Sequence, residues 1–376
     1  MSTVEQQYFT LLRAALWDTS VSVDGEIDWE SVMQIAGFHG NNVLIADVAS
    51  RMTDNKPSPE MLAKMQSGMR NNLFHLMKLR QILTSAVNLL REHGIEPVVL
   101  KGFGLAMLYP NPTLRQIGDT DLFVGIANFH EACTLLRTLP GSYNWGEEVD
   151  IGRHYNIEFG HISLEVHRVS ADIEDAKLYP HYAAIEQEGL IDHPQRVDYE
   201  GLEMSIPSKE FVVFFTFYHA WHHYLETGVG LRQLSDITMA LHSYHGQLDV
   251  DKLRQWLNTM RVMKPWQTFG YLLVERLGLP EAEMPFYDAS CQKRAQKLYR
   301  QIMKEGNFKR RSNSFKHKKP KHHFWHKTHA FICIFVDFFH RVGVFPAQAF
   351  HEMRNTMRVS FGKNFKKNEN FVQRMN

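Results

Sequence analysis

Cysteine is scarce in this chain. Its 376 residues include three cysteines, Cys133, Cys291 and Cys333, which lie far apart in the sequence. They are too few and too scattered for a disulfide framework or a cysteine metal site. This pattern fits a protein of the reducing cytoplasm.

Long apolar stretches are also missing. No uncharged apolar run approaches the roughly 18 residues that a simple membrane-spanning helix needs. The first residues, MSTVEQQYFTLLRAALWD, lack the basic-then-apolar layout of a signal peptide. We therefore expect a cytoplasmic protein.

Several nucleotide-binding and catalytic motifs are absent too. No Walker A pattern occurs, and Gly102-Phe103-Gly104 is too short for a dinucleotide fingerprint. No serine or cysteine motif suggests a covalent nucleophile, and no motif predicts specific nucleic-acid recognition.

What is present is an ordinary globular composition with an uneven charge. Apolar residues make up 44% and charged residues 22%, and the net charge is +1. Residues 307–376 hold 15 Lys/Arg and 3 Asp/Glu, a net of +12; the first 306 residues hold 27 and 38, a net of −11. Such asymmetry suggests a basic tail that meets an anionic surface.

The tail combines basic and aromatic residues. Lys309 to Lys327 contains eight Lys/Arg, four His and no acid, and a run rich in phenylalanine at helical spacing follows, ending near Phe345. This predicts contact with an anionic membrane surface through residues 309–345, peripherally at the inner face of the membrane. The alternative is that the aromatic helix packs on the acidic body of the chain.

Apolar spacing predicts the main elements. Helical patterns cover residues 5–17, 28–52 and 60–93, with Asp28 as an N-cap for the second. Two short buried strands are predicted at 98–100 and 119–124, and helices at 104–109 and 127–139. Residues 155–169 read as a hairpin that turns at Gly160-His161, and the chain becomes helical again from Ser208.

These elements predict an α+β fold, a small mixed sheet with helical regions on both sides. We expect four parts: an N-terminal helical region at 1–70, an α+β core at 71–206, a helical domain at 207–300 and the basic, aromatic-rich tail at 301–376.

The stretch RQIGDTDLFV places two carboxylates at the start of a predicted buried strand. Asp119 and Asp121 are two residues apart, so their side chains point to one face. Carboxylates on one face repel unless a cation lies between them, and a hard divalent ion such as Mg²⁺ prefers oxygen ligands. Glu165, on the second arm of the hairpin, is the candidate third carboxylate. Two acids at this spacing also occur by chance as solvated residues at a strand start.

The run VVLKGFGLAMLYPNPTLRQIGDTDLFV resembles the uncharacterised nucleotidyltransferase-like family of the polymerase-β superfamily. The matching elements are Lys101-Gly102, Tyr109-Pro110, Arg115, and Gly118 with the two aspartates. SLEVHR resembles the later acid-x-His strand, with Glu165 and His167, and residues 5–260 resemble the family more broadly. One difference is that Lys101-Gly102-Phe103-Gly104 stands where the superfamily has Gly-Ser or Gly-Gly.

The resemblance implies a nucleotidyltransferase that moves an NMP group from an NTP to a hydroxyl of a small molecule or envelope precursor. Asp119, Asp121 and Glu165 would hold two Mg²⁺ ions, with Mn²⁺ as a substitute, and would be catalytic. The phosphate-binding candidates are Lys101, Gly102, Gly104, Arg115 and Gly118. The alternative is a non-catalytic nucleotide- or partner-binding scaffold that retains the fold.

Histidines supply further candidates. His219, His222 and His223 share one helical face and are either zinc ligands, cleft residues or partners of Asp236. His167, His219 and Arg232 are candidate cleft residues. Arg232 and Asp236, four apart, alternatively form a helix salt bridge, and His167 alternatively serves only the hairpin.

Overall fold

The structure is a computed structural model that describes residues 2–143, 153–173, 175–226, 228–306, 338–339, 341–350 and 353–354. Within these residues no helix is both long and apolar enough to cross a membrane.

A six-stranded mixed sheet lies at the centre of the fold, in the order β3-β4-β2-β1-β6-β5. The strands are β1 Val98–Val99, β2 Thr120–Phe123, β3 His154–Phe159, β4 Ile162–His167, β5 Gln195–Tyr199 and β6 Leu202–Ile206. β2 runs parallel to β4 and antiparallel to β1. The two parallel neighbours, β2 and β4, bring residues from distant parts of the chain side by side.

Two hairpins form the edges of the sheet. The predicted hairpin is present as β3 and β4, with Gly160 at φ +69° in its turn. The hairpin of β5 and β6 was not predicted from the sequence. Its turn residues, Glu200 and Gly201, both have positive φ, as a two-residue type I′ turn requires.

Three short helices form the N-terminal part: α1 Thr3–Leu16, α2 Trp29–His39 and α3 Asn42–Arg51. Asp28 caps α2 by accepting a hydrogen bond from the backbone N–H of Ser31, as predicted. The helical pattern over 28–52 divides into two helices because Gly40 adopts φ +76°, a left-handed conformation that ends α2.

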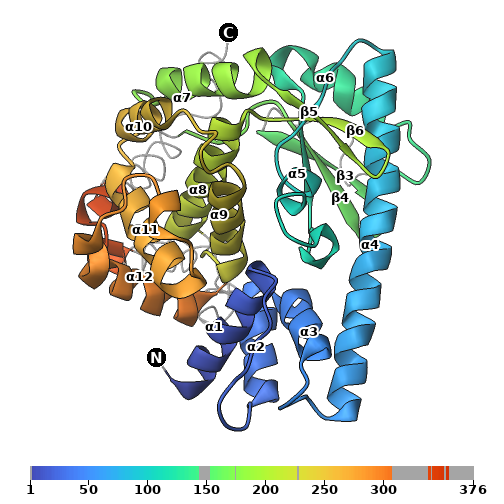
Figure 1. Cartoon of the computed structure of the whole chain (residues 1–376). Helices are drawn as coiled ribbons and strands as arrows, with labels where there is room; N and C mark the ends of the chain where they lie inside the picture. The colour runs from blue at the N-terminus through green and yellow to red at the C-terminus, as the bar shows by residue number, and fades with distance from the viewer. Residues whose placement is uncertain are drawn as a thin grey trace, which may run out of the picture.

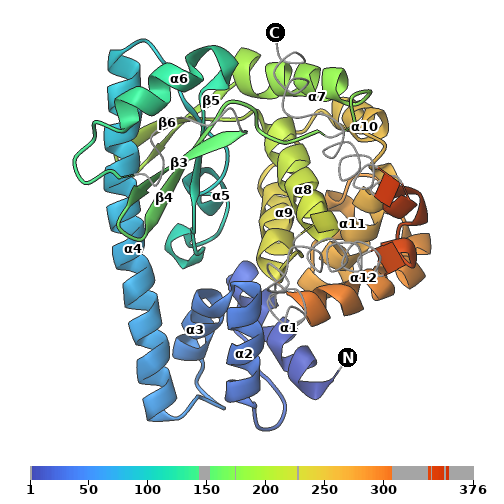
Figure 2. The same ribbon diagram turned by 180° about the vertical axis from the view of Figure 1, so that it is seen from behind.

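Helix α4, Pro59–Glu92, is a single helix that extends along one whole side of the molecule (Figures 1 and 2). Its first part packs beside α3, and its later residues Leu79, Leu83 and Leu90 are fully buried against the sheet. It therefore runs without interruption across the predicted boundary at residue 70.

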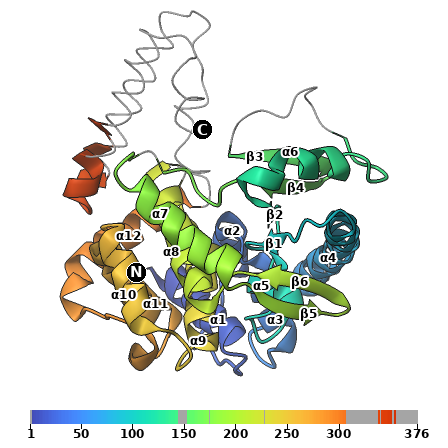
Figure 3. The ribbon, with the colours of Figure 1, turned by 90° about the horizontal axis from the view of Figure 1, so that it is seen from above.

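The sheet has two different faces. Alternate residues of β2 and β4, including Leu122, Leu164 and Val166, pack in a core with α4 and α6, Gly125–Leu136. Phe123 and Val98 belong to a second core, formed mainly by the helices. From above, the strands lie between α4 and α8, Lys209–Glu226 (Figure 3).

The remaining helical segments are α5 Phe103–Ala106, α7 Tyr179–Glu186, a π-helix at Gln187–Asp192, α9 Leu231–Ser243, α10 Val250–Thr259, α11 Met263–Leu277 and α12 Gln292–Glu305, with short 3₁₀ turns between some of them. Three of these, α9 to α11, were expected from the apolar spacing after Ser208, whereas α12 was not. The α+β class is confirmed: a mixed sheet has helices before and after it in the chain.

Candidate functional site

The sequence-predicted carboxylates meet at the centre of the sheet. Asp121 on β2 and Glu165 on β4 are direct register partners in the parallel pair. Their side chains lie on the face opposite Leu122 and Leu164, which point into the core with α4 and α6. The pairing of two distant strands, not local spacing, brings Glu165 to the aspartates.

Asp121 is the buried member of the group, with 2% of its surface exposed. Its Oδ1 lies 3.0 Å from Lys101 Nζ and 3.0 Å from His167 Nε2. Burial alone would raise the pKa of Asp121, but Lys101 and His167 outweigh it and hold that pKa below its ordinary value. Its Oδ2 is buried without a hydrogen-bond partner among the described residues, so one oxygen remains for a further ligand.

His167 lies between two carboxylates and is equally buried. Its Nε2 is also 3.3 Å from Glu165 Oε2, but neither contact has hydrogen-bond angles. Burial lowers the pKa of His167, whereas Asp121 and Glu165 raise it, and the net shift is upward. The pKa of Glu165 is lowered, because contact with His167 outweighs burial.

Asp119 precedes β2 and is exposed. Partial desolvation and the nearby charges of Glu165 and Asp121 raise its pKa. Asp119 lies two residues before Asp121 on the same side of the strand, and Asp121 pairs with Glu165, so the three carboxylates share one region, where a cation would relieve their repulsion.

Lys101 links the sheet to α8. Besides Asp121, its Nζ lies 3.3 Å from Nε2 of His219, and the same nitrogen of His219 lies 2.9 Å from Nε2 of His223. Burial, Lys101 and His223 all lower the pKa of His219 well below its ordinary value. A neutral imidazole therefore borders the carboxylate site from the helical side.

Arg115 has a buried carboxylate partner. Its Nε and Nη2 donate to the two oxygens of Asp236 at 2.6 and 2.9 Å, and Tyr109 OH donates to Asp236 at 2.8 Å. Both charged residues are almost fully buried. Arg115 thus joins the sheet to α9, and the ion-pair partner of Asp236 is Arg115 instead of the expected Arg232.

Arg232 lies near the acidic group. Its Nη1 donates to the carbonyl of Gln116 at 3.4 Å, and Asp119 is among the charges that act on it. Burial and the neighbouring Arg115 lower the pKa of Arg232. A second cation therefore borders Asp119, which makes Arg232 a phosphate-binding candidate.

The predicted phosphate-binding glycines have different surroundings. Gly102 has φ +69°, and its carbonyl accepts a hydrogen bond from Arg115 Nη1. Gly104 packs on β6, where an added Cβ would lie 3.1 Å from Ile206 Cγ2, whereas Gly118 has open space around it. Gly104 therefore serves helix-to-sheet packing, and Gly118 leaves the approach to Asp119 unobstructed.

A compact ligand group was missed by the sequence analysis. One ligand atom each from His154, Glu165 and His167 lie within 4.8 Å of one another, the one such group of three among the described residues. Neither aspartate belongs to it. In a hairpin that turns at residues 160 and 161, positions 154 and 167 are opposite each other. The predicted turn was therefore enough to pair His154 with His167.

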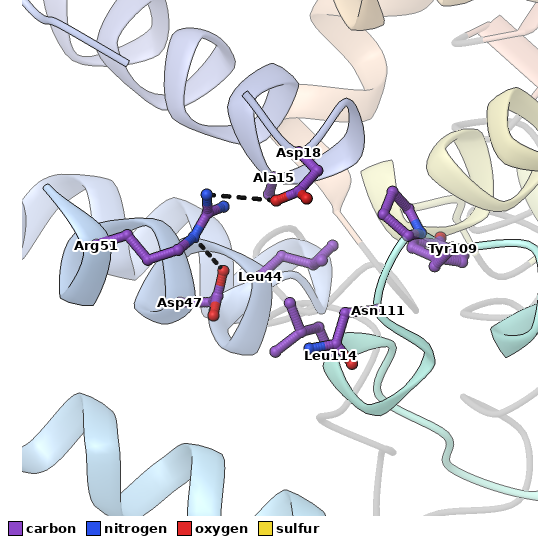
Figure 4. A pocket seen from close by; sticks show the side chains of 9 residues that line it. Ala15, Asp18, Leu44, Asp47, Arg51, Tyr109, Asn111 and Leu114 are labelled. Carbon is purple, nitrogen blue, oxygen red and sulfur yellow. Dashed lines mark hydrogen bonds and ion pairs between the residues drawn. The ribbon is translucent and has the colours of Figure 1, made fainter. Parts of the chain in front are cut away.

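Two cavities among the described residues lie elsewhere. One, of about 160 Å³, lies between α1, α3 and the 109–114 segment (Figure 4). Its only cation, Arg51, already pairs with Asp18 and Asp47 at 3.3 and 2.8 Å. It is smaller than typical ligand pockets. The other, of about 630 Å³, lies between the start of α1 and α12. Neither contains a residue of the carboxylate group.

The chain is similar to known proteins in two comparisons. A family model described as an uncharacterised nucleotidyltransferase matches residues 25–278. The chain is also similar to the crystal structure of an antigenic nucleotidyltransferase-like protein from Paracoccidioides brasiliensis, with 14% identity and a TM-score of 0.35, over 56% of this chain and 94% of that one. No curated protein matches.

Proposed function

This chain belongs to the uncharacterised nucleotidyltransferase family, and we propose that it transfers an NMP group from an NTP to a hydroxyl-bearing acceptor with the help of two Mg²⁺ ions, for which Mn²⁺ substitutes. The acceptor class is a small molecule or an envelope precursor. The alternative is a scaffold that binds a nucleotide or a partner without chemistry.

The observation that carries the proposal is the pairing of Asp121 with Glu165 on adjacent parallel strands, with Asp119 beside them. The residues fit a divalent ion, because Asp121 keeps one buried carboxylate oxygen without a hydrogen-bond partner. Strands hold such a group more rigidly than loops do, and metal geometry requires that rigidity.

Asp119 and Asp121 would hold the ion that carries the nucleotide, and Glu165 would help to hold the second. When bound, divalent ions stabilise the attacking and leaving oxygens of an in-line displacement. The acceptor oxygen bonds to the α-phosphorus, the bond from that phosphorus to pyrophosphate breaks, and the proton of the hydroxyl leaves toward Glu165. Lys101 and Arg232 supply positive charge beside the phosphates.

The test is release of pyrophosphate from each NTP in the presence of Mg²⁺ and a panel of hydroxyl acceptors. Asp119→Asn should lower the rate by roughly 10²-fold or more, in line with the loss of a group that stabilises transition-state charge. Because Asp119 is exposed and is repelled by Glu165 and Asp121, its substitution should not lower the melting temperature of the metal-free protein. If an NTP with Mg²⁺ raises the melting temperature but no acceptor supports pyrophosphate release, the scaffold alternative is favoured.

We also propose that the basic tail contacts an anionic membrane surface. Most of residues 309–345 lie outside the described residues, but the helix before them supports the idea. Along α12, Lys293, Lys297, Arg300 and Lys304 are exposed and recur at steps of four, three and four, which places them in one stripe. Phe345, in contrast, is buried against Trp221 and Tyr224 of α8, so it is not available to a membrane.

A further inference from the structure

We infer that His154, Glu165 and His167 form a binding site for a zinc-class transition-metal ion, separate from the Mg²⁺ ligands Asp119 and Asp121. The catalytic use of this ion rests on the proposed function, whereas its binding does not. Glu165 is the residue that the two sets of ligands share.

Backbone pairing places the three donors together. His154 and His167 are register partners across the β3–β4 hairpin, with ring centroids 5.0 Å apart, and Glu165 is two residues before His167 on the same face of β4. The three ligand atoms lie within 4.8 Å of one another. Two strands, rather than flexible loops, therefore set the spacing.

The surroundings of His167 provide independent support. The side chain is 2% exposed, yet among the described residues Nδ1 has no partner, and Nε2 has ion-pair contacts with Asp121 and Glu165 but no hydrogen bond. Leaving a buried polar atom without a partner costs about 1–3 kcal/mol. A metal ion bound by a lone pair of one ring nitrogen would remove part of this cost. The carboxylate of Asp121, at ion-pair distance from Nε2, is placed to orient the ring, as carboxylates beside metal-binding histidines commonly do.

The donor set selects the kind of ion. Mg²⁺ prefers an octahedron of oxygen atoms and retains water, whereas two imidazoles and one carboxylate suit Zn²⁺ and its neighbours in the first transition series. Two histidines and one glutamate are also a donor set of zinc sites that keep a fourth position open for water or substrate. In the proposed transferase, an ion held by these residues would supply positive charge close to Glu165, the residue that receives the acceptor proton.

The experiment measures Zn²⁺ binding to the full chain by competition with a chromophoric chelator, and Co²⁺ binding by its visible absorption spectrum. Wild type should bind one Zn²⁺, and its Co²⁺ complex should show the intense absorption of a four-coordinate site. His154→Phe should weaken Zn²⁺ binding by at least about tenfold and abolish that spectrum. The matched control is His161→Phe, because His161 is an exposed histidine in the turn of the same hairpin.

Two further variants separate this site from the transferase proposal. Asp119→Asn should leave Zn²⁺ affinity at the wild-type value, whereas Glu165→Gln should weaken it. If His154→Phe binds Zn²⁺ as tightly as wild type and the His161→Phe control, the inference is overturned, whatever the transfer assay shows. If Zn²⁺ binding depends on His154 but no NTP is turned over, the metal site stands and the transferase proposal fails.

Discussion

At the scale of single residues, Asp119 and Asp121 differ in their surroundings although they are two positions apart. Asp121 is buried and held by Lys101 and His167, so its position is fixed before any ligand arrives. Asp119 is exposed at the start of the strand. One aspartate is therefore fixed by its neighbours, and the other is accessible to solvent, as the proposed binding of a nucleotide requires.

A substitution of Arg115 tests whether this residue mainly stabilises the fold through Asp236 or binds phosphate directly, as the sequence predicted. Arg115→Met would leave Asp236 as a buried carboxylate without its cation, because both residues are almost fully buried. We expect a loss of about 3–5 kcal/mol in the free energy of unfolding, measured by urea denaturation. A double-mutant cycle with Asp236→Asn should show strong coupling. A stable Arg115→Met protein with weakened NTP binding would instead support a direct phosphate contact.

His167 predicts a specific pH dependence in metal-free protein. Because its pKa is raised in the folded state, its stabilisation is complete below the unfolded value of about 6.5 and is lost as the pH rises through the folded value. With EDTA present, the difference in unfolding free energy between wild type and His167→Gln should therefore shrink from pH 5.5 to pH 8.5. A difference that stays constant across this range would contradict the assignment; His161→Gln is the control.

At the scale of elements, local sequence patterns predicted most helices and one hairpin, but they did not predict which distant residues contact each other. The β3–β4 hairpin, the long helix at 60–93 and the helices after Ser208 follow from periodicity and turn residues. The β5–β6 hairpin was missed because its turn, Glu200-Gly201, is not one of the strongest turn pairs and β5, QRVDY, is mostly polar. The partnership of Arg115 with Asp236 spans 121 residues, and nothing in local spacing indicates it.

The central site was predictable only in part for the same reason. Alternation placed Asp119 and Asp121 on one face. Alternation in the hairpin also named Glu165, and the family resemblance agreed, but its approach to the aspartates depends on the pairing of β2 with β4. His154 follows from the hairpin once its turn is fixed. Lys101, His219 and Arg232 come from three separate elements, so their positions required the folded chain.

Helix α4 provides a stability test at this scale. Leu83 is fully buried in the core that α4 shares with the sheet, whereas Leu73, on the same helix, is 45% exposed. Leu83→Ala should lower the unfolding free energy by about 2–5 kcal/mol, and Leu73→Ala by less than about 1 kcal/mol. Equal losses in urea denaturation would contradict the packing of α4 described here.

At the scale of the whole molecule, the carboxylate site lies where the two hydrophobic cores meet. The sheet core with α4 and α6 supports β2 and β4, and the helical core supplies α8 with His219 and α9 with Asp236 and Arg232. The contacts Lys101–His219 and Arg115–Asp236 connect these parts. Changes in the helical half should therefore affect the site, although it contributes none of the carboxylates.

The charge distribution gives a prediction for the complete chain. Changing Lys293, Arg300 and Lys304 of α12 to Gln should reduce co-sedimentation with phosphatidylserine vesicles by about tenfold or more, since each basic residue contributes on the order of 1 kcal/mol near such a surface. The control changes three exposed cations of α4, Lys64, Arg70 and Lys78, to Gln and so removes the same charge. Equal losses in both variants would show that net charge, rather than the stripe, governs binding.

The most direct test of the central claim is a crystal structure of the protein with Mn²⁺ and a non-hydrolysable NTP, with Mn²⁺ located by anomalous scattering. We expect an anomalous peak at coordination distance, about 2.2 Å, from oxygens of Asp119 and Asp121, with the triphosphate on the same ion and Glu165 beside it. A nucleotide bound elsewhere, or Mn²⁺ that contacts none of the three carboxylates, would contradict the account.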